Sequence, residues 1–161
     1  MKRADAGGAI IEPTWRVHSQ QMTNWGTFDG GGHVMPFSPT TTLISGAPGT
    51  GKSTMLDAYL AVMMPGTRLR FNEASNDTSG RNRDAATGQR TLITYLRGKT
   101  GEYRERGSAE KKDTLLRGNN TSTWGAVALN FANDLGEQFS AIRLFFVPRE
   151  ASTDGTSSRS G

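Results

Sequence analysis

A glycine-rich run ending in lysine and serine is the part of this 161-residue chain whose spacing points most directly to chemistry. Residues 46–53, "GAPGTGKS", fit the pattern G-x-x-x-x-G-K-[ST] in full. Glycine lets the backbone of such a loop curl until successive N–H groups face inward, a geometry that binds phosphate oxygens. The pattern predicts a nucleotide-binding P-loop lined by Gly46, Ala47, Pro48, Gly49, Thr50, Gly51, Lys52, Ser53 and Thr54.

Two side chains of this loop have separate expected roles. Lys52 supplies a mobile positive charge for the β- and γ-phosphates, and Ser53 offers a hydroxyl to Mg²⁺. A helix that starts at the loop adds its free N–H groups and the positive end of its dipole. The predicted cofactors are therefore ATP and Mg²⁺, with Ser53 as the metal-binding residue.

The segments on both sides of the loop match what a P-loop requires. Residues 41–45, "TTLIS", form a short apolar run that predicts a buried strand entering the loop. A helix is expected over 53–64, ending before Pro65-Gly66. Its apolar residues recur at helical spacing and are Leu56, Tyr59, Leu60 and Met63.

Other segments predict an antiparallel β-lobe around this unit. The expected elements are a strand within 15–30, an edge strand at 33–37 that contains Pro36, a short helix at 89–98, and strands at 122–134 and 140–147 joined by a turn at 134–137. Residues 68–88 are polar and read as a long loop. The aromatic residues expected in the core are Trp15, Trp25, Trp124, Phe28 and Phe131.

Composition excludes several classes of site. The chain has no cysteine, which excludes disulfides, thiolate catalysis and zinc ribbons, and its only histidines are His18 and His33. No stretch approaches the roughly 20 apolar residues of a membrane helix, and the N-terminus lacks an apolar signal region. We expect a cytoplasmic protein without a membrane partner.

The positive charge is concentrated in one segment. Residues 81–117 hold ten lysines and arginines against five acidic residues, a balance of +5 in a chain whose net charge is +4. Such a segment can face the phosphates of DNA. A solvated, salt-bridged surface is the favoured interpretation of charge alone.

A carboxylate that would hold Mg²⁺ and orient water is not evident. Hydrolysis needs an acid directly after an apolar strand. In "LFFVPRE" Pro148 interrupts the strand before Glu150, and in "ALNFAND" Asp134 falls in the expected turn. This absence separates three classes of P-loop protein. A ring-type ATPase would place its acidic strand soon after the loop, and a small-molecule kinase would continue with alternating strands and helices and an arginine-rich lid. Here a long polar loop, a short helix and an antiparallel hairpin follow, so the third class is an ATPase head whose acidic strand comes from distant sequence.

The order of these segments resembles the N-terminal half of the ATPase head of structural-maintenance-of-chromosomes (SMC) proteins. It is most similar to the MukB-like branch, which includes the JetC subunit of Wadjet plasmid-defence systems. The blocks that carry the likeness are "NWGTFDG" (24–30), "GKSTMLDAYLAVMMP" (51–65), "RLRFNEASND" (68–77), "GQRTLITYLRG" (88–98) and "WGAVALNF" (124–131).

This resemblance implies an α/β P-loop NTPase fold of the ABC/SMC type, in which an antiparallel β-lobe packs on the Walker strand–loop–helix unit. The head half would span 13–148, between a flexible lead-in at 1–12 and a flexible tail at 149–161. By this resemblance, a C-terminal head half and the second head of a homodimer would complete the site. Kleisin-type and accessory subunits would be further partners. The ATPase cycle would drive movement along DNA. We accordingly expect a truncated or fragmentary chain that binds ATP without turning it over.

The resemblance also suggests residues near the nucleotide. They are Asn24 and Thr27 before the P-loop, and Arg81, Arg83 and Arg90 after its helix. Two alternatives stay open: a small P-loop phosphotransferase or regulatory nucleotide-binding module that acts alone, and a structural or DNA-binding domain that uses residues 81–117.

Overall fold

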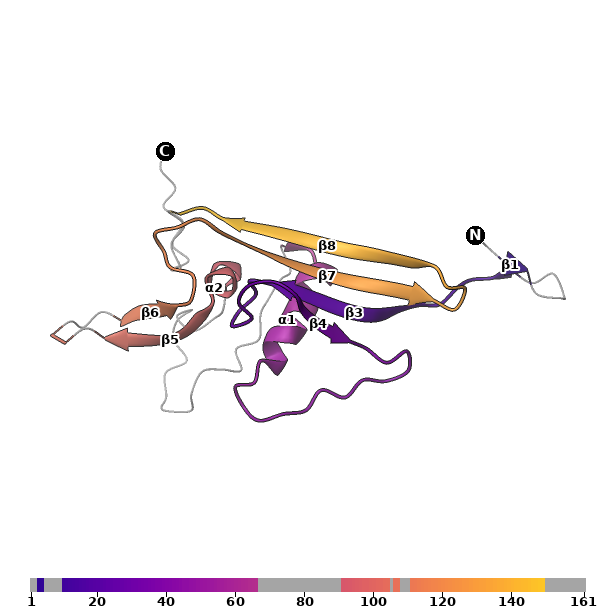
Figure 1. Ribbon diagram of the computed structural model, residues 1–161, viewed down its shortest axis with the longest axis horizontal. Helices are drawn as coiled ribbons and strands as arrows, with labels where there is room; N and C mark the ends of the chain where they lie inside the picture. The colour runs from indigo at the N-terminus through magenta and orange to yellow at the C-terminus, as the bar shows by residue number, and fades with distance from the viewer. Residues whose placement is uncertain (1–2, 5–9, 67–90, 105, 108–110, 150–161) are drawn as a thin grey trace.

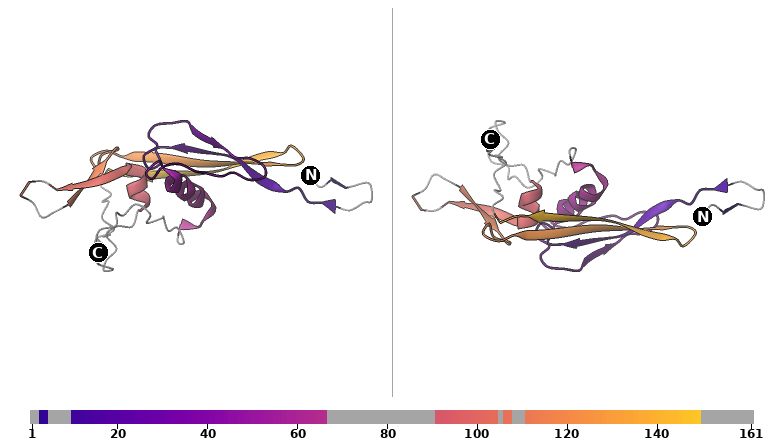
Figure 2. Two further views of the ribbon diagram at one scale, coloured as in Figure 1. Left: turned by 90° about the horizontal axis from the view of Figure 1, so that it is seen from below. Right: turned by 90° about the horizontal axis from the view of Figure 1, so that it is seen from above.

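A four-stranded antiparallel sheet with two helices on one face forms the centre of the molecule (Figures 1 and 2). The computed structural model describes residues 3–4, 10–66, 91–104, 106–107 and 111–149. The strand order is β4-β3-β7-β8, and every neighbouring pair is antiparallel. The bounds are β3 Trp15–Thr23, β4 His33–Pro36, β7 Thr123–Asn133, β8 Gln138–Val147, α1 Lys52–Met63 and α2 Leu92–Arg97.

Two smaller antiparallel pairs extend from opposite ends of this sheet (Figure 1). β1 Arg3–Ala4 pairs with β2 Ile10–Ile11, inside the segment expected to be a flexible lead-in. β5 Lys99–Arg104 pairs with β6 Lys111–Leu115. The sequence did not predict the β5–β6 hairpin, because its strands are polar and show no alternating apolar pattern.

Most of the predicted β-lobe is confirmed. β3 and β4 form the expected hairpin, and β4 lies at the edge of the sheet with Pro36 as its last residue. β7 and β8 are joined by the expected turn, in which the Gly136 N–H donates to the Asn133 carbonyl (3.1 Å). The short helix α2 is also present, with Tyr95 and Leu96 buried.

The buried face of α1 is not the predicted one. The helix turns small or polar residues toward the sheet, and its buried positions are Thr54, Asp57, Ala58 and Ala61. Leu56 and Met63 of the expected face are instead 53% and 49% exposed. Small side chains let the helix axis approach the sheet closely, and the Asp57 carboxylate accepts a hydrogen bond from the Tyr95 hydroxyl in the core.

The prediction of a strand at 41–45 is also wrong. These residues have no regular secondary structure and are exposed, Leu43 by 88%. A strand requires a neighbour for its backbone N–H and C=O groups, and no described strand lies beside this segment. The P-loop is therefore entered from an extended, unpaired segment.

The core is built where α1 and α2 meet the sheet. Trp25 is fully buried, and its ring stacks on that of Tyr95 with centroids 4.9 Å apart. Val127 and Leu96 are fully buried as well. Of the aromatic residues expected here, Trp124 is half exposed and Trp15 is 40% exposed, so for these two the expectation was wrong. Phe28 packs against the core from a half-buried position, and the half-buried Phe131 stacks on Phe139.

Gly125 on β7 allows α2 and the end of β3 to approach the sheet. A Cβ at this position would lie 2.5 Å from Leu96 Cδ2 and 2.8 Å from the Asn24 carbonyl oxygen. We predict that Gly125→Ala lowers the free energy of unfolding by about 2 kcal/mol, because backbone and core atoms must move to admit the methyl group. Denaturant unfolding measures this change.

Gly31→Ala is the matched control, since a Cβ at Gly31 meets no atom within 4 Å. Equal stability of the two variants would contradict the packing described for Gly125.

Candidate nucleotide-binding site

The P-loop has the curled backbone that the glycine pattern predicts. Gly46, Gly49 and Gly51 all have positive φ angles, of 156°, 81° and 90°. Gly51 is the N-cap of α1, and a Cβ there would lie 3.0 Å from the ring of Phe28. Glycine is required at this position both for the left-handed backbone and for the contact with Phe28.

The side chain of Lys52, the first residue of α1, folds back over the P-loop. Its Nζ donates to the carbonyl oxygens of Gly46 (2.7 Å) and Ala47 (2.8 Å), while the Thr50 hydroxyl donates to the same Ala47 carbonyl (2.9 Å). The ammonium is thus held at the loop by neutral acceptors. Phosphate oxygens are stronger acceptors for an ammonium than carbonyls, so a triphosphate can replace these contacts.

The first turn of α1 presents unused N–H groups to this loop. Gly51 provides no side-chain cap, and the first turn contains no acidic residue. The positive end of the helix dipole is therefore not neutralised by a side chain. Ser53 is half buried in this turn, whereas the Thr54 side chain is buried with its methyl group beside Gly26. Thr54 would contribute to a phosphate site through its backbone N–H.

A loop formed by residues 24–30 supports the start of α1. The Trp25 indole N–H donates to the Thr54 carbonyl (3.0 Å), and Gly26 lies so close to Thr54 that a Cβ on Gly26 would be 2.6 Å from Thr54 Cγ2. The Phe28 ring lies against Gly51. This loop holds the P-loop helix in place from the sheet side.

The two predicted nucleotide-proximal residues in this loop differ in their surroundings. Asn24 closes the loop, because its backbone N–H donates to the Gly30 carbonyl (3.1 Å) and its side-chain oxygen accepts from the Gly30 N–H (3.0 Å). Thr27 is exposed in the turn between Trp25 and Phe28. Arg81, Arg83 and Arg90 lie outside the described residues.

Arg117 is a supporting residue that sequence reasoning did not single out. Its guanidinium donates to the carbonyl oxygens of Leu96 (2.5 Å), Gly26 (2.8 Å) and Tyr95 (3.2 Å) and pairs with Asp29. It therefore fastens the 24–30 loop to α2. No sequence signal marks it, since only the fold brings residue 117 beside residue 26.

Several charges of the basic segment 81–117 are used inside the fold. Arg97 is fully buried and donates to the carbonyl oxygens of Gly118, Thr121 and Pro148, and its burial lowers the pKa of the guanidinium. Lys99 pairs with Asp113 (2.6 Å) and Glu102 (2.9 Å). Partial burial opposes the charged form of Lys99, but these two carboxylates raise its pKa above the ordinary value.

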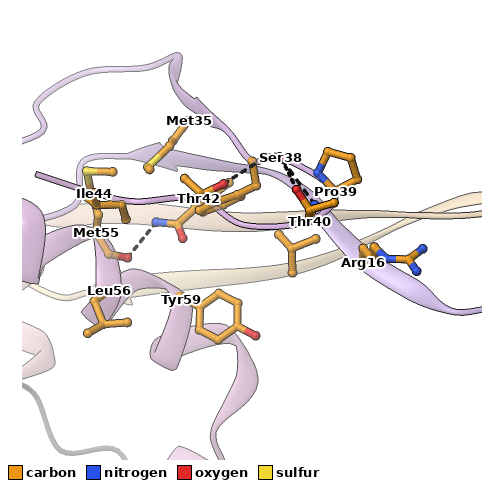
Figure 3. A pocket seen from close by; sticks show the side chains of 13 residues that line it. Arg16, Met35, Ser38, Pro39, Thr40, Thr42, Ile44, Met55, Leu56 and Tyr59 are labelled. Atoms are coloured by element: carbon orange, nitrogen blue, oxygen red, sulfur yellow. Dashed lines mark hydrogen bonds between the residues drawn. The ribbon is translucent and has the colours of Figure 1, made fainter.

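A cavity of about 510 Å³ lies beside the P-loop rather than at it (Figure 3). It separates the 37–44 segment from β3 and α1, and none of its lining residues belongs to 46–53. Its apolar lining includes Met35, Phe37, Ile44, Met55 and Leu56. The segment that enters the P-loop is thus not packed against the helix that leaves it.

In comparison with known families, residues 17–78 match the family described as the P-loop containing region of AAA domain. This is a P-loop NTPase-like domain. The matched range includes most of β3, all of β4, the P-loop and α1. No curated protein matches the chain.

Two further findings concern metal-binding clusters and membrane-spanning helices. The described residues contain no group of three or more histidine, aspartate or glutamate side chains placed to hold a metal ion. Neither α1 nor α2 has the length and apolar character that crossing a membrane demands, and the described part of the chain contains no other helix. P-loop domains in general bind a nucleotide together with Mg²⁺.

Replacing Arg117 tests whether it supports the P-loop. We predict that Arg117→Met lowers the free energy of unfolding by about 3 kcal/mol, because buried carbonyl acceptors lose a charged donor. Arg117→Lys is expected to recover less than half of this loss, since one ammonium cannot reach the same set of acceptors. Denaturant unfolding of both variants is the measurement, with Arg104→Met on exposed β5 as the control. A stability for Arg117→Met within about 0.5 kcal/mol of the parent chain would contradict this role.

Proposed function

We propose that this chain binds Mg·ATP as the Walker A half of an SMC-like ATPase head that acts on DNA, in plasmid defence or chromosome maintenance. Binding rests on the positive-φ glycines, the Lys52 ammonium at the loop and the uncapped N-terminus of α1. Ser53 is the proposed ligand of Mg²⁺. Asn24, Thr27, Arg81, Arg83 and Arg90 remain candidates for positions near the nucleotide.

The observation that carries the proposal of a half-head is the exposure of apolar residues on both sides of the P-loop. Leu43 and Ile44 before it are 88% and 40% exposed, and Leu56 and Met63 after it are 53% and 49% exposed. Ile44 and Leu56 line the same cavity, and apolar side chains that gather at an exposed surface commonly mark a contact with another protein segment. In the proposed head, the C-terminal half covers this surface and supplies a strand beside 41–45.

The surroundings of two described carboxylates, Asp57 and Asp29, agree with hydrolysis that depends on a second segment. Asp57, one helical turn after Ser53, is buried and accepts a hydrogen bond from Tyr95. Asp29 pairs with Arg117. We therefore assign the hydrolytic acid to the C-terminal half and expect turnover only when a second head closes over the nucleotide. Kleisin-type and accessory subunits belong to the same proposal.

The DNA part of the proposal cannot rest on the whole basic segment 81–117. Arg97, Lys99 and Arg117 are engaged in contacts within the fold. Of the described side chains of the β5–β6 region, Arg104, Arg106 and Lys112 are exposed cations. A DNA contact through this region would depend on these three residues.

The central prediction concerns Lys52. The parent chain is expected to bind Mg·ATP and release no phosphate, and Lys52→Ala is expected to lose at least about tenfold in affinity, since the charge opposite the β- and γ-phosphates is removed. Isothermal titration calorimetry measures binding, and a phosphate-release assay measures turnover. Arg106→Ala, an exposed charge change away from the loop, serves as the control.

Two outcomes would count against this proposal. Steady ATP turnover by the isolated chain would favour a phosphotransferase or ATPase that acts alone. Unchanged ATP affinity in Lys52→Ala would remove the P-loop from the site.

A further inference from the structure

The two edges of the central sheet differ in how open they are to another strand. β4 is four residues long and ends in Pro36, which blocks extension of the edge. β8 is ten residues long and pairs only with β7 among the strands that the structure describes (Figure 1). Its outer row of backbone N–H and C=O groups is available to a further strand.

The side chains of β8 add an apolar surface to this open edge. On the sheet face opposite the helices, Ile142, Leu144 and Phe146 are 64%, 74% and 69% exposed. In the register of the sheet, Phe146 lies beside Trp124, which is 51% exposed. We call Trp124, Ile142, Leu144 and Phe146 the β8 patch.

The β8 patch is bounded by polar residues along the same face. The next residue pair on this face after Ile142 is Ser140 and Asn130. The Ser140 hydroxyl donates to the Asn130 side-chain oxygen (2.6 Å), and the Asn130 amide donates to the Ser19 hydroxyl (2.9 Å). Along β8 and β7, the exposed apolar surface on this face therefore ends at the Ser140–Asn130 pair. The β8 patch covers the end of β8 nearest Pro148.

Strand edges that are exposed in solution usually carry a charged side chain that prevents pairing with another strand. The charged side chain of β8 does not lie on its outer face. Arg143 is the only charged residue within β8. Its guanidinium donates to the carbonyl oxygens of Ala61 (2.7 Å) and Met64 (2.8 Å) at the end of α1, on the helix face of the sheet. The outer face of β8 has no charge to oppose association.

We propose that β8 pairs antiparallel with β8 of a second copy of this chain, joining the two four-stranded sheets into one continuous sheet. A twofold axis perpendicular to the sheet keeps both sets of helices on one face. It also places the two β8 patches side by side on the other face.

One register of this pairing places the β8 residues of the patch opposite one another. An axis at Arg143 would place two arginines directly opposite each other, which is unfavourable. An axis at Leu144 places Leu144 opposite itself, Ile142 opposite Phe146 and Arg143 opposite Phe145, and it overlaps residues 141–147 of both copies. Arg143 already lies over Phe145 of its own chain, 6.0 Å from the ring centroid, so a second aromatic ring beside the guanidinium is compatible with its position.

This inference goes beyond the proposed ATPase function and does not depend on it. The pairing surface is on the sheet face and edge, whereas the P-loop is at the N-terminus of α1. The β8 dimer should therefore form without nucleotide and should persist in Lys52→Ala. A dimer of heads closed over ATP would behave in the opposite way.

Sedimentation equilibrium of the full chain without nucleotide tests the association. We expect a reversible dimer, and we expect Leu144→Glu to weaken it at least about tenfold, because two carboxylates would meet at the twofold axis. Leu144 is 74% exposed, so the variant should keep its fold. Val34→Glu, an exposed position on the opposite edge strand, is the matched control and should stay dimeric.

Disulfide formation tests the register independently of any destabilisation. The natural chain has no cysteine, so a crosslink in Leu144→Cys can only join the introduced thiols of two copies. Ile142→Cys should not crosslink, because two such residues would be about 13 Å apart along the paired strands, beyond the reach of a disulfide. A monomer at all concentrations, assemblies larger than a dimer, or equal crosslinking of the two variants would overturn the proposal.

Discussion

The fixed distance between the 24–30 loop and the first turn of α1 is the constraint on which the candidate site depends. Three contacts define it: the hydrogen bond from the Trp25 indole to the Thr54 carbonyl, the approach of Gly26 to Thr54, and the Phe28 ring against Gly51. Each of them requires a particular residue type. Together they hold a left-handed glycine and the unused N–H groups of a helix N-terminus at one place on the sheet.

The rest of the described structure keeps this arrangement rigid. Arg117 ties the loop to α2, and Tyr95 of α2 stacks on Trp25 and donates to Asp57 of α1. Loop, sheet and both helices are thereby linked through one buried cluster. Away from the cluster, the 41–45 segment and the outer surfaces of α1 and β8 expose apolar side chains. The chain thus combines a well-supported P-loop with surfaces suited to contact other protein segments.

The sequence predicted the elements better than their packing. The P-loop, α1, α2 and the β3–β4 and β7–β8 hairpins follow from local signals such as glycine spacing, helical periodicity and turn residues. The buried face of α1 did not follow from these signals. Leu56 and Met63 were expected to be buried, but Ala58 and Ala61 are the buried residues. The prediction of a strand at 41–45 was wrong, because an apolar run forms a strand only when a partner strand lies beside it.

The supporting residues of the site were the hardest to predict. Arg117 is 91 residues from Gly26 in sequence, and its role depends on contacts that only the tertiary structure creates. The basic segment 81–117 suggested a surface for DNA, but Arg97 is fully buried within it. Charge counted along the sequence cannot separate a cation that faces solvent from one that holds backbone carbonyls together.

Nuclear magnetic resonance titration of the ¹⁵N-labelled chain with Mg·ATP tests the central claim most directly, since it reports on the backbone N–H groups themselves. The account predicts that the amides of Gly49, Gly51, Lys52, Ser53 and Thr54 shift together and saturate at one affinity. Amides of the β8 patch should not move. An absence of shifts at millimolar ATP, or shifts confined to residues that line the cavity beside α1, would contradict it.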